Sequence, residues 1–174
     1  MRTYVALLRG VNVGGRSLPM AELRAVFFDL GFDDVRSYIQ SGNVVFRSSA
    51  TGAPAAAAIE ERLAETAGLD TVVILRTCAQ LDKVVAGNPL VKGRDVSKLH
   101  VTFLARRPVA ATPTADDGLY LPDRFRVVGN EVYVYCPNGY GRTKLNNTFF
   151  EKSLGISATT RNWNTVNALA RMAA

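Results

Sequence analysis

Apolar positions in the first half of the chain switch between strand-like and helix-like spacing. Leu23, Val26 and Phe27 are separated by three and then one position, which is typical of one face of a helix. The order of expected elements is a strand over 3–9, a helix over 18–30, strands over 34–40 and 43–48, a helix over 54–67 and a strand over 71–76. The pattern therefore predicts β-α-β-β-α-β, followed by a helix over 78–87.

The second half repeats this order with a weaker pattern. We expect a strand over 98–105, a short helix near 112–120, strands over 124–128 and 131–136, a helix over 143–154 capped by Thr143, a strand over 156–160 and a helix over 161–173. In each half a Gly-Asn pair, Gly42-Asn43 or Gly129-Asn130, separates the two middle strands and suits a tight hairpin turn. The pattern predicts an α+β fold with two ferredoxin-like (βαββαβ) subdomains in tandem, each with a trailing helix. A single larger mixed sheet is the alternative.

The length of the chain allows this division. Its 174 residues suffice for one sizeable core or two small ones. Periodicity is interrupted by Pro and Gly over residues 87–97, which is typical of a linker. We therefore expect a first subdomain over residues 1–90 and a second over residues 91–174.

Cysteine usage and the length of the apolar runs indicate a compartment. Cys78 and Cys136 are the only cysteines and His100 is the only histidine, so neither a disulfide framework nor an ordinary zinc site is indicated. No apolar run approaches the roughly 20 residues that span a bilayer, and the first strand begins too early for a signal peptide. We expect a cytoplasmic protein with no membrane contact, no metal and no cofactor.

Positive charge is concentrated at the two ends of the chain. The net charge is +6; residues 1–50 carry six Lys or Arg against four Asp or Glu, and residues 139–174 carry five against one. Such an excess favours an anionic partner, with a basic solvated surface as the alternative.

The segment RGVNVGGR, residues 9–16, joins the first strand to the first helix. It fits neither GxGxxG nor GxxxxGK[ST], so the common nucleotide fingerprints are excluded. Glycines, exposed N–H groups near a helix start and arginines nevertheless favour an anion, whereas a purely structural turn is the alternative. The hairpin at 41–43 is expected at the same edge of the sheet. The first candidate binding cluster is Arg9, Asn12, Gly14, Gly15, Arg16, Ser41 and Asn43.

A second cluster follows from cations at predicted helix starts. Positive charge there is unfavourable by about 0.3–1 kcal/mol unless an anion or a carboxylate answers it. GRTK and TTRN, at residues 141–144 and 159–162, both place cations in this way. The second candidate cluster is Tyr140, Arg142, Lys144, Arg161 and Asn162. Pairing with carboxylates elsewhere in the chain is the alternative.

Several long segments carry a family resemblance. LLRGVNVGG, YIQSGNVVF, PNGYGRTKLNNTFFEK and TTRNWNTV together resemble the bacterial family known as domain of unknown function 1697. The resemblance covers essentially the whole chain and implies two ferredoxin-like subdomains in tandem. It implies no reaction and no functional residue. Leu90 departs from the pattern, which has an aromatic residue after Asn-Pro.

The main functional hypothesis is a binding protein for a phosphorylated ligand, either a nucleic acid or a nucleotide. One alternative is an enzyme acting on a small anionic metabolite, in which Tyr140, Cys136 or His100 transfers protons. Another is a protein-interaction module without a ligand. The sequence leaves the oligomeric state open.

Overall fold

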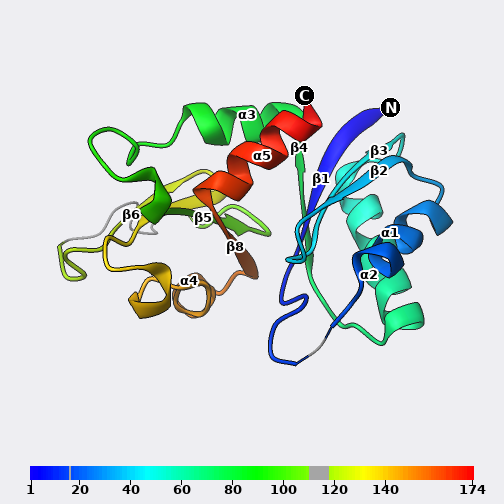
Figure 1. Ribbon diagram of the computed structural model, residues 1–174, viewed down its shortest axis with the longest axis horizontal. Coiled ribbons are helices and arrows are strands. Elements are labelled where there is room, and N and C mark those ends of the chain that lie inside the picture. The colour runs from blue at the N-terminus through cyan, green and yellow to red at the C-terminus, as the bar shows by residue number, and fades with distance from the viewer. Residues whose placement is uncertain (16, 110–117) are drawn as a thin grey trace. The chain divides into compact units, whose positions relative to one another are not determined.

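A computed structural model describes residues 1–15, 17–109 and 118–174. The first half contains the predicted elements in the predicted order (Figure 1). They are β1 (Arg2–Leu8), α1 (Met20–Asp29), β2 (Asp33–Tyr38), β3 (Asn43–Ser48), α2 (Gly52–Ala67), β4 (Val73–Thr77) and α3 (Cys78–Ala86). The hydrophobic periodicity therefore located each of these elements to within a few residues.

Within the described ranges, the second half also contains four strands, with helices after the third and the fourth. Its elements are β5 (Leu99–Leu104), β6 (Arg124–Val128), β7 (Glu131–Tyr135), α4 (Asn147–Leu154), β8 (Ala158–Asn162) and α5 (Trp163–Ala173). Short 3₁₀ turns at Val96–Lys98 and Tyr140–Arg142 precede β5 and α4. The helix predicted near 112–120 falls largely on residues 110–117, which lie outside the described residues.

The strands form two separate sheets within the described residues. Each sheet has four antiparallel strands, in the orders β2-β3-β1-β4 and β6-β7-β5-β8. The alternative of one larger mixed sheet is therefore wrong. The Gly-Asn pairs lie at the β2–β3 and β6–β7 turns as predicted, with φ of +73° at Gly42 and +61° at Gly129.

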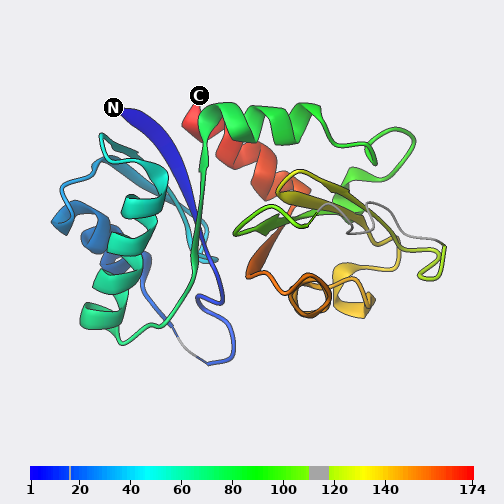
Figure 2. The ribbon, with the colours of Figure 1, turned by 180° about the vertical axis from the view of Figure 1, so that it is seen from behind.

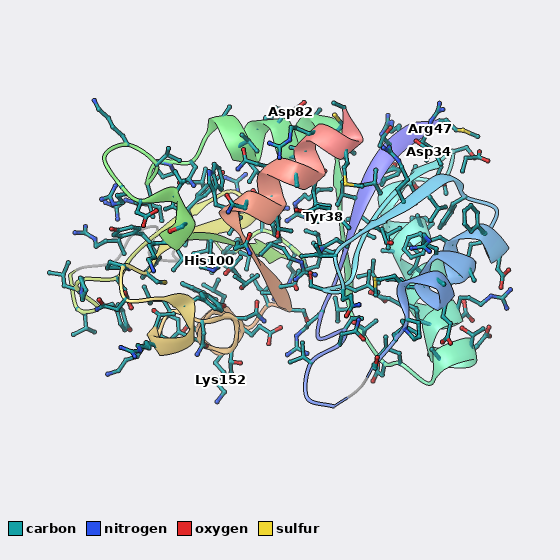
Figure 3. All side chains as sticks on the ribbon, viewed as in Figure 1. Asp34, Tyr38, Arg47, Asp82, His100 and Lys152 are labelled. Carbon is teal, nitrogen blue, oxygen red and sulfur yellow. The ribbon has the colours of Figure 1, made fainter. Side chains whose placement is uncertain are left out.

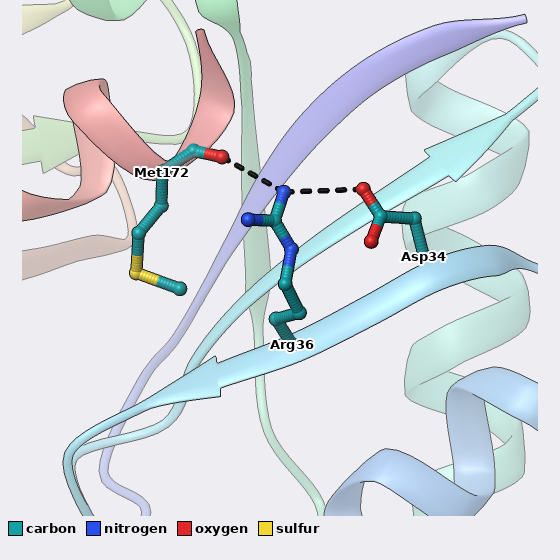
Figure 4. Close-up of polar contacts among 3 residues, drawn as sticks. All are labelled: Asp34, Arg36 and Met172. Atoms are coloured by element: carbon teal, nitrogen blue, oxygen red, sulfur yellow. Dashed lines mark hydrogen bonds and ion pairs between the residues drawn. The ribbon is translucent and has the colours of Figure 1, made fainter.

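The chain divides into two compact units. The first comprises Met1–Asp82 and Leu169–Ala174, and the second comprises Lys83–Ala168. Both trailing helices, α3 and α5, begin in one unit and end in the other. The guanidinium of Arg36 donates from Nη2 to the carbonyl of Met172 at 2.8 Å and pairs with Asp34 at 3.1 Å (Figure 4). These contacts join the end of α5 to β2 within the first unit.

The core of the first unit lies between one face of its sheet and the helices α1 and α2, as both ribbon views show (Figures 1 and 2). Phe27 and Phe46 meet edge to face with ring centroids 5.1 Å apart, and Phe32 lies 4.7 Å from Phe46. These rings belong to a cluster of buried hydrophobic side chains that also includes Leu23 and Ile59.

The core of the second unit lies between its sheet and α4. Phe125 and Phe150 meet edge to face at 5.4 Å, beside the buried side chains of Leu104, Val132 and Leu145. On the second unit's other sheet face, the Tyr133 hydroxyl donates to the carbonyl of Val84 in α3 at 3.0 Å. None of the helices in the described ranges is long and apolar enough to cross a bilayer.

Helix α4 begins four residues later than predicted. Its cap is Asn146, whose Oδ1 accepts from the N–H of Phe149 at 2.9 Å. The predicted cap, Thr143, instead donates its hydroxyl to Asp123 at 2.6 Å. The extended backbone at Thr143 and the preceding 3₁₀ turn keep this segment out of the helix.

Candidate functional site

In the first candidate cluster, Asn12 is a structural residue. Its Nδ2 donates to the carbonyls of Leu18 and Gln40 at 3.2 and 2.7 Å, and its Oδ1 accepts from the N–H of Leu18 at 2.5 Å. Asn12 also has φ of +57°, which asparagine tolerates better than most residues. Its amide therefore ties the loop after β1 to the β2–β3 hairpin.

Asn43 and Ser41 likewise build the hairpin. The Asn43 side chain is fully buried and donates to the carbonyl of Tyr38 at 3.1 Å and to the Ser41 hydroxyl at 2.8 Å. A Cβ on Gly42 would come within 3.0 Å of the Leu8 Cβ, so the turn also requires glycine for space. Both polar side chains serve the scaffold.

The glycine-rich loop precedes a helix as predicted, but its glycines do not adjoin the first turn of that helix. Helix α1 begins at Met20 after Pro19, with no side-chain cap, so Gly14 and Gly15 precede it by several residues. Arg9 is exposed, as are both glycines, which have φ of +69° and +87°; Arg16 lies outside the described residues. A nearby cavity of about 350 Å³ is lined by residues 11, 12, 17, 18 and 67–69. None of the described residues that line this cavity is charged, and Arg16 is not among those residues.

The second candidate cluster contains a pocket of about 330 Å³. We call it the basic pocket. It is lined by residues 119–123, 138, 139 and 142–144. Arg142 and Lys144 are exposed on one wall, with the buried Thr143 between them. Two of the predicted cations therefore meet at one small concave surface.

Thr143 connects the two walls of the basic pocket. Its hydroxyl donates to Asp123 Oδ2 at 2.6 Å and accepts from the N–H of Leu145 at 3.0 Å. Because Asp123 belongs to the opposite wall segment, this bridge fixes the two segments against each other. The hydroxyl is satisfied in both directions, which makes the bridge a rigid contact.

The cations of the basic pocket are not neutralised within the described part of the chain. No ion pair or side-chain hydrogen bond involves Arg142 or Lys144 there, and Asp123 is bonded through its side chain to Thr143 alone. Charged side chains normally gain from a partner of opposite sign. Among the described residues, the pocket therefore presents two positive charges without an ion-pair partner.

Arg161 does not join this cluster. Its guanidinium is buried in β8 and donates to Thr159 Oγ1 and the Thr160 carbonyl at 2.7 and 2.9 Å. Burial lowers the pKa of Arg161 to about 10. The interpretation of Arg161 as a cation at a helix start is wrong, because Asn162 is the residue that caps α5, accepting from the N–H of Thr165 at 2.8 Å.

The first unit holds a counterpart of Arg161. Arg76 lies opposite Val5 in the β1–β4 register, as Arg161 lies opposite Val101 in the β5–β8 register. Arg76 is also buried and donates from Nη1 to the preceding carbonyl, that of Leu75, at 2.9 Å. A repeated buried arginine in the same register indicates a role in the architecture.

Tyr140 belongs to a polar network that the sequence analysis missed. Its ring stacks on His100 with centroids 4.4 Å apart, and its hydroxyl accepts from the N–H of Asn147 at 2.9 Å. The chain of contacts continues from Asn147 to Thr160 at 3.0 Å and from Thr160 to Thr102 at 2.8 Å. The feature of the sequence that could have indicated this network is the pair Thr102 and Thr160, which occupy facing positions on β5 and β8. Figure 3 marks His100 within the second unit.

Burial shifts the pKa values of the titratable groups in this region in the direction that favours the uncharged form. It lowers the pKa of His100 and raises the pKa of Tyr140. It raises the pKa of the Cys136 thiol to about 11. Burial also raises the pKa of Cys78, with a further contribution from Asp82. Neither thiol is thus a ready nucleophile at neutral pH.

No metal centre appears among these groups. Across the described residues, no three His, Cys, Asp or Glu side chains come together in a way that could hold a metal ion. His100 Nδ1 is buried and lacks a hydrogen-bond partner within the same residues.

Fold and pocket together define an α+β protein with two antiparallel sheets and a small basic pocket. Residues 1–133 match the family described as protein of unknown function (DUF1697). The chain belongs to this family. No curated protein matches the chain.

A solved structure supports the architecture. The chain is similar to a protein described as the conserved bacterial protein SP0830 from Streptococcus pneumoniae, with 21% sequence identity and a TM-score of 0.76. The similarity covers 99% of each chain. At this level of identity the likeness concerns the fold alone.

Proposed function

We propose that this protein binds a phosphorylated ligand in the basic pocket. The observation that carries the proposal is that Arg142 and Lys144 line a small pocket and form no ion pair with any residue that the structure describes. A phosphate group between them gains charge-assisted hydrogen bonds, which are about twice as strong as neutral ones. The net charge of +6 adds a general attraction for anions.

A nucleotide fits the pocket better than a nucleic acid. The volume of about 330 Å³ lies at the lower end of the range for small-molecule sites, roughly 300–1,000 Å³. A nucleic acid backbone needs cations spread along a track, whereas Arg142 and Lys144 lie on one short segment. Leu119, Tyr120 and Leu121 offer an apolar surface beside them for the remainder of the ligand.

Calorimetric titration with inorganic phosphate and with nucleoside monophosphates tests the proposal. The double variant Arg142→Gln/Lys144→Gln is expected to bind both kinds of probe at least roughly tenfold more weakly, since it loses charge-assisted hydrogen bonds. Thermal unfolding gives a second readout, because a ligand at 100 times its Kd stabilises the protein by about 2.7 kcal/mol.

The matched control is Lys92→Gln/Lys152→Gln. Both lysines are exposed, belong to the second unit and do not line the basic pocket. Lys152 points outward from α4 (Figure 3). This variant loses the same charge and is expected to bind like the wild type. Equal weakening in both double variants would overturn the pocket as the site, and so would a wild-type protein that binds none of the probes.

We also propose a fold for each unit, the bounds of the two domains and the cellular compartment of the protein. Each unit is ferredoxin-like, a view supported by the shared strand orders β2-β3-β1-β4 and β6-β7-β5-β8. The folding domains are residues 1–90 and 91–174, so that each trailing helix stays with the strands before it. The protein acts in the cytoplasm, where two free thiols such as Cys78 and Cys136 are normal.

A further inference from the structure

Among the described residues that line the basic pocket, Asp123 is the one with an acidic side chain. Its Oδ2 accepts from Thr143, while its Oδ1 has no hydrogen-bond partner within the described ranges. The carboxylate forms no ion pair with Arg142 or Lys144 there. Within the described residues, the pocket therefore carries two cations and one carboxylate oxygen, Asp123 Oδ1, that have no partner in the chain.

A carboxylate is a costly neighbour for a phosphate. Like charges repel, so Asp123 weakens the attraction that Arg142 and Lys144 provide. Holding Thr143 does not require this charge, because a neutral asparagine also offers an acceptor oxygen. An ionised carboxylate differs from an amide in that it only accepts hydrogen bonds, through both oxygens. Its remaining oxygen suits a ligand group that donates.

We propose that Asp123 accepts hydrogen bonds from sugar hydroxyls, so that the basic pocket selects ribonucleotides over equally charged ligands that lack these hydroxyls. This inference rests on the proposed function of the pocket. Arg142 and Lys144 hold the phosphate, Asp123 holds the ribose, and the apolar wall of Leu119 and Leu121 covers the remainder. These leucines are 74% and 62% exposed, so their surface is open to a ligand.

The test compares ligands of equal charge. Calorimetry on the wild-type protein uses inorganic phosphate, the four common ribonucleoside 5′-monophosphates and their 2′,3′-dideoxy counterparts. A hydrogen bond to a charged group is worth a factor of roughly ten or more. At least one ribonucleotide is therefore expected to bind about tenfold more tightly than its dideoxy counterpart.

The variant Asp123→Asn isolates the charge, since its amide oxygen still accepts from Thr143. We expect it to lose the preference for the ribose hydroxyls and to bind inorganic phosphate as tightly as the wild type or more tightly. The variant Lys92→Gln is expected to keep the preference.

The outcomes separate this inference from the proposal on which it rests. Equal binding of ribo- and dideoxynucleotides by the wild type would overturn it, and so would a preference that persists in Asp123→Asn. A third outcome is that phosphate binding requires Arg142 and Lys144 but no nucleotide binds. This outcome would overturn the inference about ribose and leave the phosphate site in place. If phosphate binding is indifferent to these two cations, the proposed function itself fails.

Discussion

The two units share a strand order but differ in the chemistry between sheet and helices. In the first unit, Ala6 faces Leu75 across β1 and β4. At the same register in the second unit, Thr102 faces Thr160, and their hydroxyls are 2.8 Å apart. Strand order follows from periodicity and turns, so it tolerates either an apolar or a polar pair at this position. The polar pair of side chains at this position is therefore a feature of the second unit and not of the first.

The units also differ in the segment that leads from their third strand into the next helix. In the first unit only residues 49–51 separate β3 from α2. In the second unit residues 136–146 separate β7 from α4, and they contain the 3₁₀ turn, Thr143 and both cations of the basic pocket. The longer connection supplies one side of the basic pocket, and its residue Thr143 is hydrogen-bonded to Asp123 in the segment that lines the other side.

The largest expected effect tests the apolar character of the first core. Phe46 is fully buried and contacts Tyr4, Phe27 and Phe32. Phe46→Ala is expected to lower the free energy of unfolding by about 3–5 kcal/mol, because it removes apolar contacts and leaves a cavity. Urea unfolding measures the loss. A loss below about 1 kcal/mol would contradict a tightly packed core.

A smaller effect tests the polar network of the second core. Thr160→Val leaves Thr102 and Asn147 without the partner shown here, which is expected to cost about 1–3 kcal/mol. Thr102→Val is expected to cost less, because Thr160 keeps its bond to Asn147. Urea unfolding of both variants makes the comparison. A Thr160→Val protein as stable as the wild type would show that the network does not stabilise the unit.

The smallest expected effect is on the pH dependence of stability, which His100 of the second unit alters. Burial lowers the pKa of folded His100, so the unfolded chain binds more protons once the pH falls below about 6.5. Stability is therefore lost as the pH drops through this value towards the lowered pKa of the folded state. His100→Gln is expected to show a shallower loss between pH 7 and pH 5.

The control for this pH effect is the corresponding position of the first unit. Tyr4 lies opposite Thr77 as His100 lies opposite Asn162. Tyr4→Phe leaves no histidine altered and is expected to keep the pH slope of the wild type. Parallel unfolding curves for wild type and His100→Gln across this range would contradict a buried neutral imidazole.

Local pattern was sufficient where the responsible contacts are local. The helix-like spacing of Leu23, Val26 and Phe27 predicted α1, and the glycines at 42 and 129 predicted the two hairpin turns. Both features depend on residues a few positions apart. The predicted cations at 142 and 144 also meet, because two positions along the chain cannot separate them far.

Predictions failed where a distant partner decides the outcome. Thr143 looked like a helix cap, but Asp123 takes its hydroxyl from twenty residues away. Arg161 looked like a cation at a helix start, but the pairing of β8 with β5 buries it on the sheet. No local rule predicts which of several acceptors a side chain will meet.

The sequence by itself determined the order of strands and helices, the hairpin turns and the basic character of the chain, because these depend on spacing and composition. Only the tertiary structure decided which positively charged side chains have hydrogen-bond partners within the described residues. It buried Arg161 among backbone and threonine oxygens and left Arg142 and Lys144 beside a pocket. The reason is that electrostatic and hydrogen-bond energies depend on distances in space, which strand pairing and loop packing set.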